Sequence, residues 1–135
     1  MTTTLDPATV FDTYAAAWSA HDADAIIALH TPDTQFWLHS GARPIHGRPA
    51  VRDAFAEMFR QWPEFGFDVH RLLIGERHWV LDWTLTAVLT DASGRPHPIR
   101  YDCLDIVTVD SAGLVERKDT YIDFPQVKAV LSGLG

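Results

Sequence analysis

Cysteine is nearly absent from this sequence. Cys103 is the single cysteine among 135 residues, so the chain cannot form an internal disulfide. Structural disulfides are typical of oxidising compartments, whereas thiols stay reduced in the cytoplasm. We therefore expect a cytoplasmic protein that is stabilised by its core and not by covalent cross-links.

Long apolar runs and basic charge are also scarce. No apolar stretch reaches the roughly 18 residues that a membrane-spanning helix needs, and the start, MTTTLDPATV, lacks the basic and apolar segments of a secretory signal. The formal net charge of −7 disfavours nucleic acid and anionic membranes as partners. No HExxH motif or Cys/His cluster occurs, so we expect no metal site and no cofactor.

The remaining composition is that of an ordinary folded domain. Hydrophobic residues make up 47% of the chain and charged residues 21%. A chain of this length can bury one sizeable core. No repeat, low-complexity tract or linker divides it, so we expect residues 1–135 to form a single domain.

Aspartate and proline residues mark the expected helices. The Asp6–Pro7 dipeptide predicts a capped helix start, and an apolar stripe follows at helical spacing. Asp22 is expected to cap a second, short helix that stops before Pro32. A third helix is expected between Pro49 and Pro63.

Alternating strand patterns occupy most of the rest. The segment Thr34–Ser40 predicts a strand with Phe36 and Leu38 on one face. Helices first and strands later predict the α+β class, with a curved antiparallel sheet wrapped around the N-terminal helices as a cone with an apolar cavity. A short helix or turn is expected after Pro125. Four further strands are expected, the last three joined by the turns DASG and DSAG: Phe65–Ile74, His78–Thr90, Pro98–Val109 and Leu114–Ile122.

Two charged residues interrupt the closing hairpin. If DSAG is a four-residue loop, Asp105 lies opposite Lys118 and Cys103 opposite Thr120. Pairing with Lys118 keeps Asp105 ionised despite desolvation. Three catalytic roles stay open: Asp105 as a base, Lys118 with Tyr14 as oxyanion stabilisers, or Lys118 as a nucleophilic amine. Alternatively, the pair is an ordinary cross-strand ion pair on a solvated face.

Aromatic residues are the other candidates for a cavity. Asp82, between aromatic residues in WVLDWTLT, is a further catalytic candidate, and an exposed outward position is its alternative. Trp79 or Trp83, depending on the phase of the strand, is expected on the outer sheet face, which predicts a homodimer through the sheet. The expected lining of the substrate pocket comprises Trp18, Phe36, Leu38, Phe55, Phe59, Cys103, Val107, Thr120 and Ile122.

The order of three segments resembles the nuclear transport factor 2-like superfamily, which includes ketosteroid isomerases, limonene-epoxide hydrolases and SnoaL-type polyketide cyclases. The segments are YAAAWSAHDADAIIALHTPD, PIHGRPAV and DCLDIVTVDSAGLVERKDTYID, and together they span nearly the whole chain. The resemblance implies a cone-shaped α+β barrel with a small-molecule pocket, and a homodimer.

The same resemblance assigns roles to single residues. The ketosteroid isomerase pattern places its oxyanion-hole groups on Tyr14 and Asp105, but its general base falls on Leu38, which cannot accept a proton. The epoxide hydrolase pattern keeps only Asp82, because its second aspartate falls on Thr120. We therefore expect cofactor-free acid–base chemistry of isomerase, cyclase or hydrolase type on a hydrophobic carbonyl compound, without steroid isomerisation. The alternative is a non-catalytic ligand-binding or dimerisation module.

Overall fold

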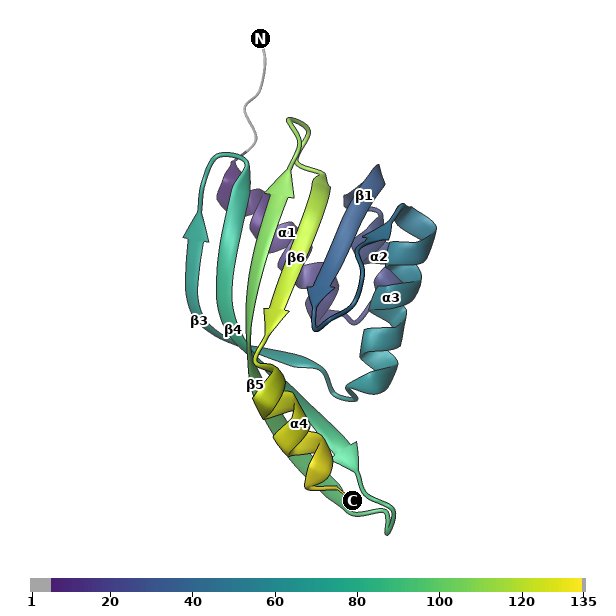
Figure 1. Cartoon of the computed structure of the whole chain (residues 1–135). Helices are drawn as coiled ribbons and strands as arrows, with labels where there is room; N and C mark the ends of the chain where they lie inside the picture. Colours follow the sequence, from purple (N-terminus) through teal and green to yellow (C-terminus); the bar gives the residue numbers. More distant parts are fainter. Residues whose placement is uncertain (1–5, 135) are drawn as a thin grey trace.

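Helices and strands alternate in the first half of the chain, and strands dominate the second half (Figure 1). A computed structural model describes residues 6–134. The helices are α1 (Pro7–Ser19), α2 (Ala23–Ile27), α3 (Arg48–Gln61) and α4 (Phe124–Ser132). The strands are β1 (His30–His39), β2 (Ile45–His46), β3 (Gly66–Ile74), β4 (His78–Thr90), β5 (Pro96–Val109) and β6 (Val115–Ile122).

Aspartate side chains cap three of the helices. Asp6 accepts a hydrogen bond from the backbone N–H of Ala8 at 3.1 Å, and Asp22 and Asp123 do the same for α2 and α4. Each bond satisfies an N–H group of the first turn that has no partner within the helix. The helix starts predicted at Asp6 and Asp22 are therefore confirmed.

The strands form a six-stranded sheet in the order β2-β1-β6-β5-β4-β3. Neighbouring strands are antiparallel except β1 and β6, which run parallel, so the expectation of a fully antiparallel sheet is wrong for this pair. Parallel neighbours need a long connection, and α3 with four intervening strands (β2 to β5) provides it. The α+β class, with N-terminal helices on a curved sheet, is confirmed.

The start of β1 differs from the expectation. Helix α2 ends at Ile27, and the strand begins at His30 and not at Thr34. Pro32 therefore lies within a strand, in a stretch where the pairing with β6 shifts register between His30 and Gln35. Such an irregularity accommodates a residue that has no N–H to donate.

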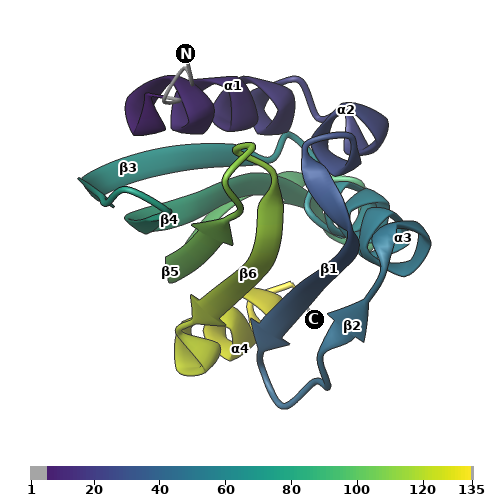
Figure 2. The same ribbon diagram turned by 90° about the horizontal axis from the view of Figure 1, so that it is seen from above.

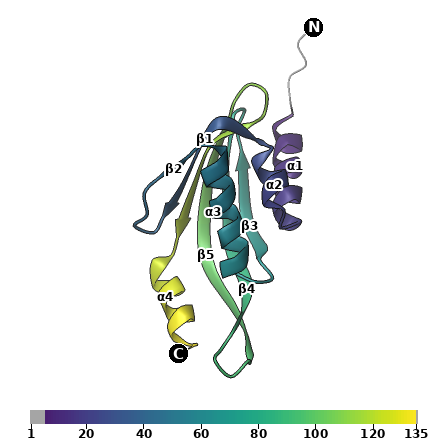
Figure 3. The ribbon, with the colours of Figure 1, turned by 90° about the vertical axis from the view of Figure 1, so that its right-hand side faces the viewer.

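The helices lie on both sides of the sheet. Helix α1 lies across β3 and β4 on the concave face, and α4 lies on the other side of the sheet (Figure 2). Helix α3 stands in front of the sheet beside α1 and α2 (Figure 3). Within residues 6–134, no helix is both long and apolar enough to cross a membrane.

The core fills the space between these helices and the concave face. Its most deeply buried apolar side chains come from α2, α3 and four strands, and burial of each contributes roughly 1.5–3 kcal/mol. They are Ile26, Phe36, Val51, Phe55, Leu85, Val107 and Val115.

Candidate functional site

The β5–β6 hairpin brings Asp105 and Lys118 onto one face. Asp105 lies opposite Thr120, and Lys118 lies one diagonal step away. The expected register is off by two residues, because the turn and an irregularity between Thr108 and Val109 each add one residue to β6. Since side chains alternate along a strand, a shift of two residues leaves each of them on its expected face.

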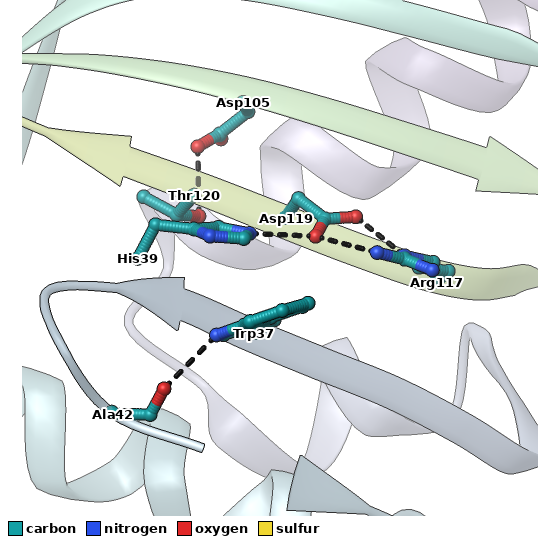
Figure 4. Close-up of polar contacts among 7 residues, drawn as sticks. All are labelled: Trp37, His39, Ala42, Asp105, Arg117, Asp119 and Thr120. Carbon is teal, nitrogen blue, oxygen red and sulfur yellow. Dashed lines mark hydrogen bonds and ion pairs between the residues drawn. The ribbon is translucent and has the colours of Figure 1, made fainter. Parts of the chain in front are cut away.

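The carboxylate of Asp105 is hydrogen-bonded at both oxygens. Lys118 Nζ donates to Oδ2 at 2.8 Å, and Thr120 Oγ1 donates to Oδ1 at 2.9 Å (the latter bond is drawn in Figure 4). Asp105 is only 2% exposed and Lys118 only 5%. A buried charge without a partner costs several kcal/mol, so each group stabilises the other. The alternative of a solvated ion pair is therefore wrong.

The Lys118 ammonium also lies over two aromatic rings. Its Nζ is 5.0 Å from the centroid of Trp18 and 5.9 Å from that of Tyr14. These rings come from one side of α1, because residues four apart in a helix share a face. Aromatic faces and the Asp105 carboxylate all stabilise an ammonium ion.

A pocket of about 440 Å³ lies between α1 and the concave face of the sheet, beside this ion pair. Its volume is in the range of small-molecule sites. Asp105, Lys118 and Thr120 supply polar groups on one wall. The aromatic lining comprises Phe11, Tyr14, Trp18, Phe65, Phe67, Trp79 and Trp83.

The expected pocket lining is only partly correct. Trp18 and Thr120 line the pocket. The other expected residues lie outside its wall. Between α3 and β1 the space is filled with side chains, as the ring contact of 5.0 Å between Phe36 and Phe55 shows. Four of them are buried in the core, namely Phe36, Phe55, Cys103 and Val107; three more are partly buried against it, namely Leu38, Phe59 and Ile122.

The phase of β4 corrects two further expectations. Asp82 lies on the outer face, where its side chain is 40% exposed and 3.8 Å from Arg71. It is therefore not part of the pocket, and the alternative of an exposed outward position is confirmed. Trp79 and Trp83 are buried and line the pocket, so the expectation of either on the outer face is wrong. Both outcomes follow from the alternation of side chains along the strand.

Tyr14 contacts a buried histidine that the sequence analysis missed. The Tyr14 hydroxyl lies 2.9 Å from Nε2 of His30, and Nδ1 of His30 lies 2.8 Å from Oγ1 of Thr34. Burial raises the pKa of Tyr14 well above its ordinary value. Burial and the positive charge of Lys118 lower the pKa of His30 to about 3, so this imidazole is neutral near pH 7. His30 lies on the same inward face of β1 as Phe36. A predicted strand that began at His30 and not at Thr34 would have indicated this position.

Metal binding and thiol chemistry find no support in the described residues. Among residues 6–134, no three His, Cys, Asp or Glu side chains lie close enough together to bind a metal ion. Burial raises the pKa of the Cys103 thiol to about 12, which leaves it protonated and unreactive near pH 7.

A second polar cluster lies on the outer face, where β1 and β6 meet (Figure 4). Asp119 accepts hydrogen bonds from His39 Nε2 at 2.8 Å and from Arg117 Nε at 2.7 Å. Burial alone would raise the pKa of Asp119, but these two partners hold it below its ordinary value. The His39 ring stacks between Trp37 and Tyr121, at centroid distances of 4.3 and 3.9 Å. This cluster fastens the two parallel strands together and does not face the pocket.

Comparisons with known proteins agree on one fold. Residues 11–117 match the family described as the SnoaL-like domain. No curated protein matches the chain significantly. A SnoaL-like protein from Shewanella putrefaciens, provisionally assigned as a polyketide cyclase, has a TM-score of 0.80 at 13% identity, with 98% of each chain covered.

Two further solved structures extend the comparison. A hypothetical protein from Catenulispora acidiphila with a ketosteroid isomerase-like fold, in complex with trimethylamine, has a TM-score of 0.76 at 17% identity, with 93% of each chain covered. SalBIII, an epoxide hydrolase/cyclase-like enzyme with a role in pyran ring formation in the polyether salinomycin, has a TM-score of 0.75 at 15% identity, with 89% of this chain and 92% of that chain covered. At such identities the likeness concerns the fold alone.

Proposed function

The chain belongs to the SnoaL-like domain family, and from that premise we propose that its pocket binds a small apolar carbonyl compound and moves a proton on it without a cofactor. The observation that carries this proposal is the buried pair of Asp105 and Lys118 in the wall of an aromatic pocket. Well-packed apolar residues can replace a buried ion pair without loss of stability. An ion pair beside a pocket therefore favours a chemical role over a structural one.

Asp105 is the proton acceptor in this proposal. Lys118 and Thr120 fix the orientation of its carboxylate and still leave lone pairs free. A proton bound to carbon next to the substrate carbonyl moves to Asp105, the electrons of that C–H bond form a C=C bond, and the carbonyl electrons move to oxygen. The result is a neutral Asp105 and an enolate.

Lys118 stabilises the charge on that oxygen. It donates one of its three N–H groups to Asp105, so two remain for a ligand. When Asp105 becomes neutral, the enolate takes over as the negative partner of the ammonium, and the charge within the site stays balanced. Aromatic walls exclude water from this contact and so strengthen it.

Exchange of α-protons for deuterium tests this function directly. We expect the protein to accelerate exchange at the α-carbons of 2-tetralone in D₂O, followed by proton NMR. Asp105→Asn should reduce the rate to that of buffer, and Lys118→Met should slow it about 100- to 1000-fold, the range of one lost oxyanion contact. Asp82→Asn is the matched control, because Asp82 lies on the outer face. Exchange that persists in Asp105→Asn would contradict the assignment.

A binding module without catalysis is the second candidate. The observation in its favour is that Asp105 already accepts a hydrogen bond at each carboxylate oxygen. Calorimetric binding of 2-tetralone by wild-type protein that does not accelerate exchange would support this alternative.

A second copy of the chain is the macromolecular partner that we propose. Apolar side chains stand exposed on neighbouring strands of the outer face, with Leu73 51%, Ile106 37% and Tyr121 41% exposed. Val80 lies between Leu73 and Ile106 in the pairing of β3, β4 and β5. Contiguous exposed apolar surface favours association.

A further inference from the structure

A chain of three hydrogen bonds runs from the pocket wall to the backbone of β6. The Tyr14 hydroxyl contacts His30 Nε2, His30 Nδ1 contacts Thr34 Oγ1, and Thr34 Oγ1 donates to the carbonyl oxygen of Glu116 at 3.4 Å. His30 and Thr34 have no exposed surface. Water therefore cannot supply or accept a proton at these two side chains.

The number of protons sets the direction of this chain. Tyr14, Thr34 and a neutral His30 each carry one proton for the three bonds, and the Glu116 carbonyl can only accept. Thr34 must then donate to Glu116, His30 Nδ1–H to Thr34, and the Tyr14 hydroxyl to His30 Nε2. The reverse arrangement would remove the hydrogen bond from Thr34 to the Glu116 carbonyl oxygen, which disfavours it.

His30 is held in place and kept neutral by its surroundings. Arg48 donates through Nε and Nη2 to the His30 carbonyl oxygen at 3.0 and 2.6 Å, which anchors the backbone. The low pKa of His30 follows from burial and from the charges of Lys118 and Arg48. Protonation of both ring nitrogens of His30 is thus disfavoured near pH 7. The three hydrogen bonds therefore share three protons and not four.

We propose that His30, oriented by Thr34, holds the hydroxyl proton of Tyr14 away from the pocket, so that Tyr14 accepts a hydrogen bond from the ligand. This inference rests on the proposed function only in treating the pocket as a ligand site. It makes His30 a positioning residue. It also reverses the role that the resemblance to ketosteroid isomerases implies for Tyr14, which is to donate to an oxyanion.

The hydrogen-bonding groups of the polar wall then define the class of ligand. The Thr120 hydroxyl donates its hydrogen bond to Asp105. Thr120, Asp105 and Tyr14 therefore all offer lone pairs to the pocket. Lys118 is the one donor among these four side chains. Such a wall favours an apolar molecule that carries a hydroxyl group, as an enol, a phenol or an alcohol, over an ether of the same shape.

The direction of these three hydrogen bonds is tested without any ligand. Long-range proton–nitrogen NMR correlation on ¹⁵N-labelled wild-type protein near pH 7 distinguishes the two ring nitrogens of His30. We expect the proton on Nδ1 and a bare Nε2. A proton on Nε2 would overturn the inference, whatever the pocket binds.

The ligand class is tested with 2-naphthol and 2-methoxynaphthalene, which differ in a single hydroxyl proton. We expect calorimetry to show 2-naphthol bound about tenfold more tightly, the factor that corresponds to one hydrogen bond. Thr34→Val should lower this preference to about threefold or less, because it removes the acceptor for His30 Nδ1–H and lets Tyr14 donate. Thr34→Ser keeps a hydroxyl and should restore the preference.

Several outcomes separate this inference from the proposed function. Equal affinities of the two probes in wild-type protein would overturn the ligand class. If Thr34→Val fails to fold, Tyr14→Phe takes its place and should also lose the preference. If neither probe binds at millimolar concentration, the ligand class fails; proton exchange on 2-tetralone then still decides the proposed function, and the NMR spectrum of His30 still decides the role of Tyr14.

Discussion

Lys118 Nζ lies 2.8 Å from Asp105 Oδ2, and the two side chains are 6% and 4% exposed. Each charge is therefore removed from water and compensated mainly by the other. Loss of one partner leaves the second charge buried alone, whereas loss of both leaves only a small apolar gap. The stability of the hairpin and the chemistry of the pocket thus depend on the same contact.

Lys118→Met should destabilise the fold by about 3–5 kcal/mol, because the methionine fills the space but leaves the Asp105 charge without its partner. The free energy of unfolding from urea titration near pH 7 measures this effect. The double variant Lys118→Met with Asp105→Leu should recover most of the loss, since neither charge remains.

The exposed pair of Arg71 and Asp82 provides the matched control. These side chains are 65% and 40% exposed and 3.8 Å apart, so Arg71→Met should cost less than about 1 kcal/mol. If Lys118→Met costs no more than Arg71→Met, the buried pair contributes nothing specific to stability.

Much of the fold was predictable because its signals are local. Asp6 and Asp22 cap helices within a few residues of sequence, and alternation along the strands defines their faces. Contact between Asp105 and Lys118 was predictable for a related reason. The predicted pairing of β5 with β6 differed from the true register by two residues, but a shift by an even number leaves each side chain on the same face of the sheet.

The pocket wall was less predictable, because it depends on how the helices pack. In WVLDWTLT the two tryptophans share one phase with Leu81 and Leu85, so alternation alone indicates the face on which they lie. Only the position of α1 shows that this face lines a pocket. His30 was missed because Pro32 concealed the start of β1, and because Tyr14 lies 16 residues away. The parallel pairing of β1 with β6 joins segments too distant for any local pattern.

Acid should destabilise the protein through His30. Its pKa falls from 6.5 in the unfolded chain to about 3 in the fold, so the unfolded state binds a proton first as pH decreases. Stability should therefore fall between about pH 6.5 and pH 3, with a contribution from His30 of up to about 1.4 kcal/mol per pH unit. His30→Gln should flatten that slope in urea titrations at pH 7, 6, 5 and 4.

The exposed His46 supplies the control for this slope. His46→Gln should reproduce the wild-type dependence on pH, because His46 lies outside the buried hydrogen bonds of His30. An unchanged slope in His30→Gln would show that the buried imidazole does not resist protonation.

Asp119 should contribute stability that depends on pH in a lower window. Its folded pKa lies below the ordinary 3.8, so the contribution is complete above about pH 4–5 and is lost as pH falls through the folded value. Asp119→Asn should cost about 1–3 kcal/mol near pH 7, where it removes charge-assisted bonds from Arg117 and His39. The difference from wild type should shrink at pH 2, as chemical denaturation can show. A loss of equal size at both pH values would mean that the charge of Asp119 is irrelevant.

The outer sheet face should join two copies of the chain. Ile106 stands in the middle of this face, between Val80 on β4 and Asp119 on β6 in the strand pairing. A lysine at its position would bury an ammonium in the interface, so Ile106→Lys should shift the protein from dimer to monomer in sedimentation velocity at micromolar concentration. Val69→Lys is the matched control, because Val69 is 51% exposed but lines the pocket on the opposite face. Wild-type protein that sediments only as a monomer, or a Val69→Lys variant that dissociates as readily as Ile106→Lys, would contradict assembly through this face.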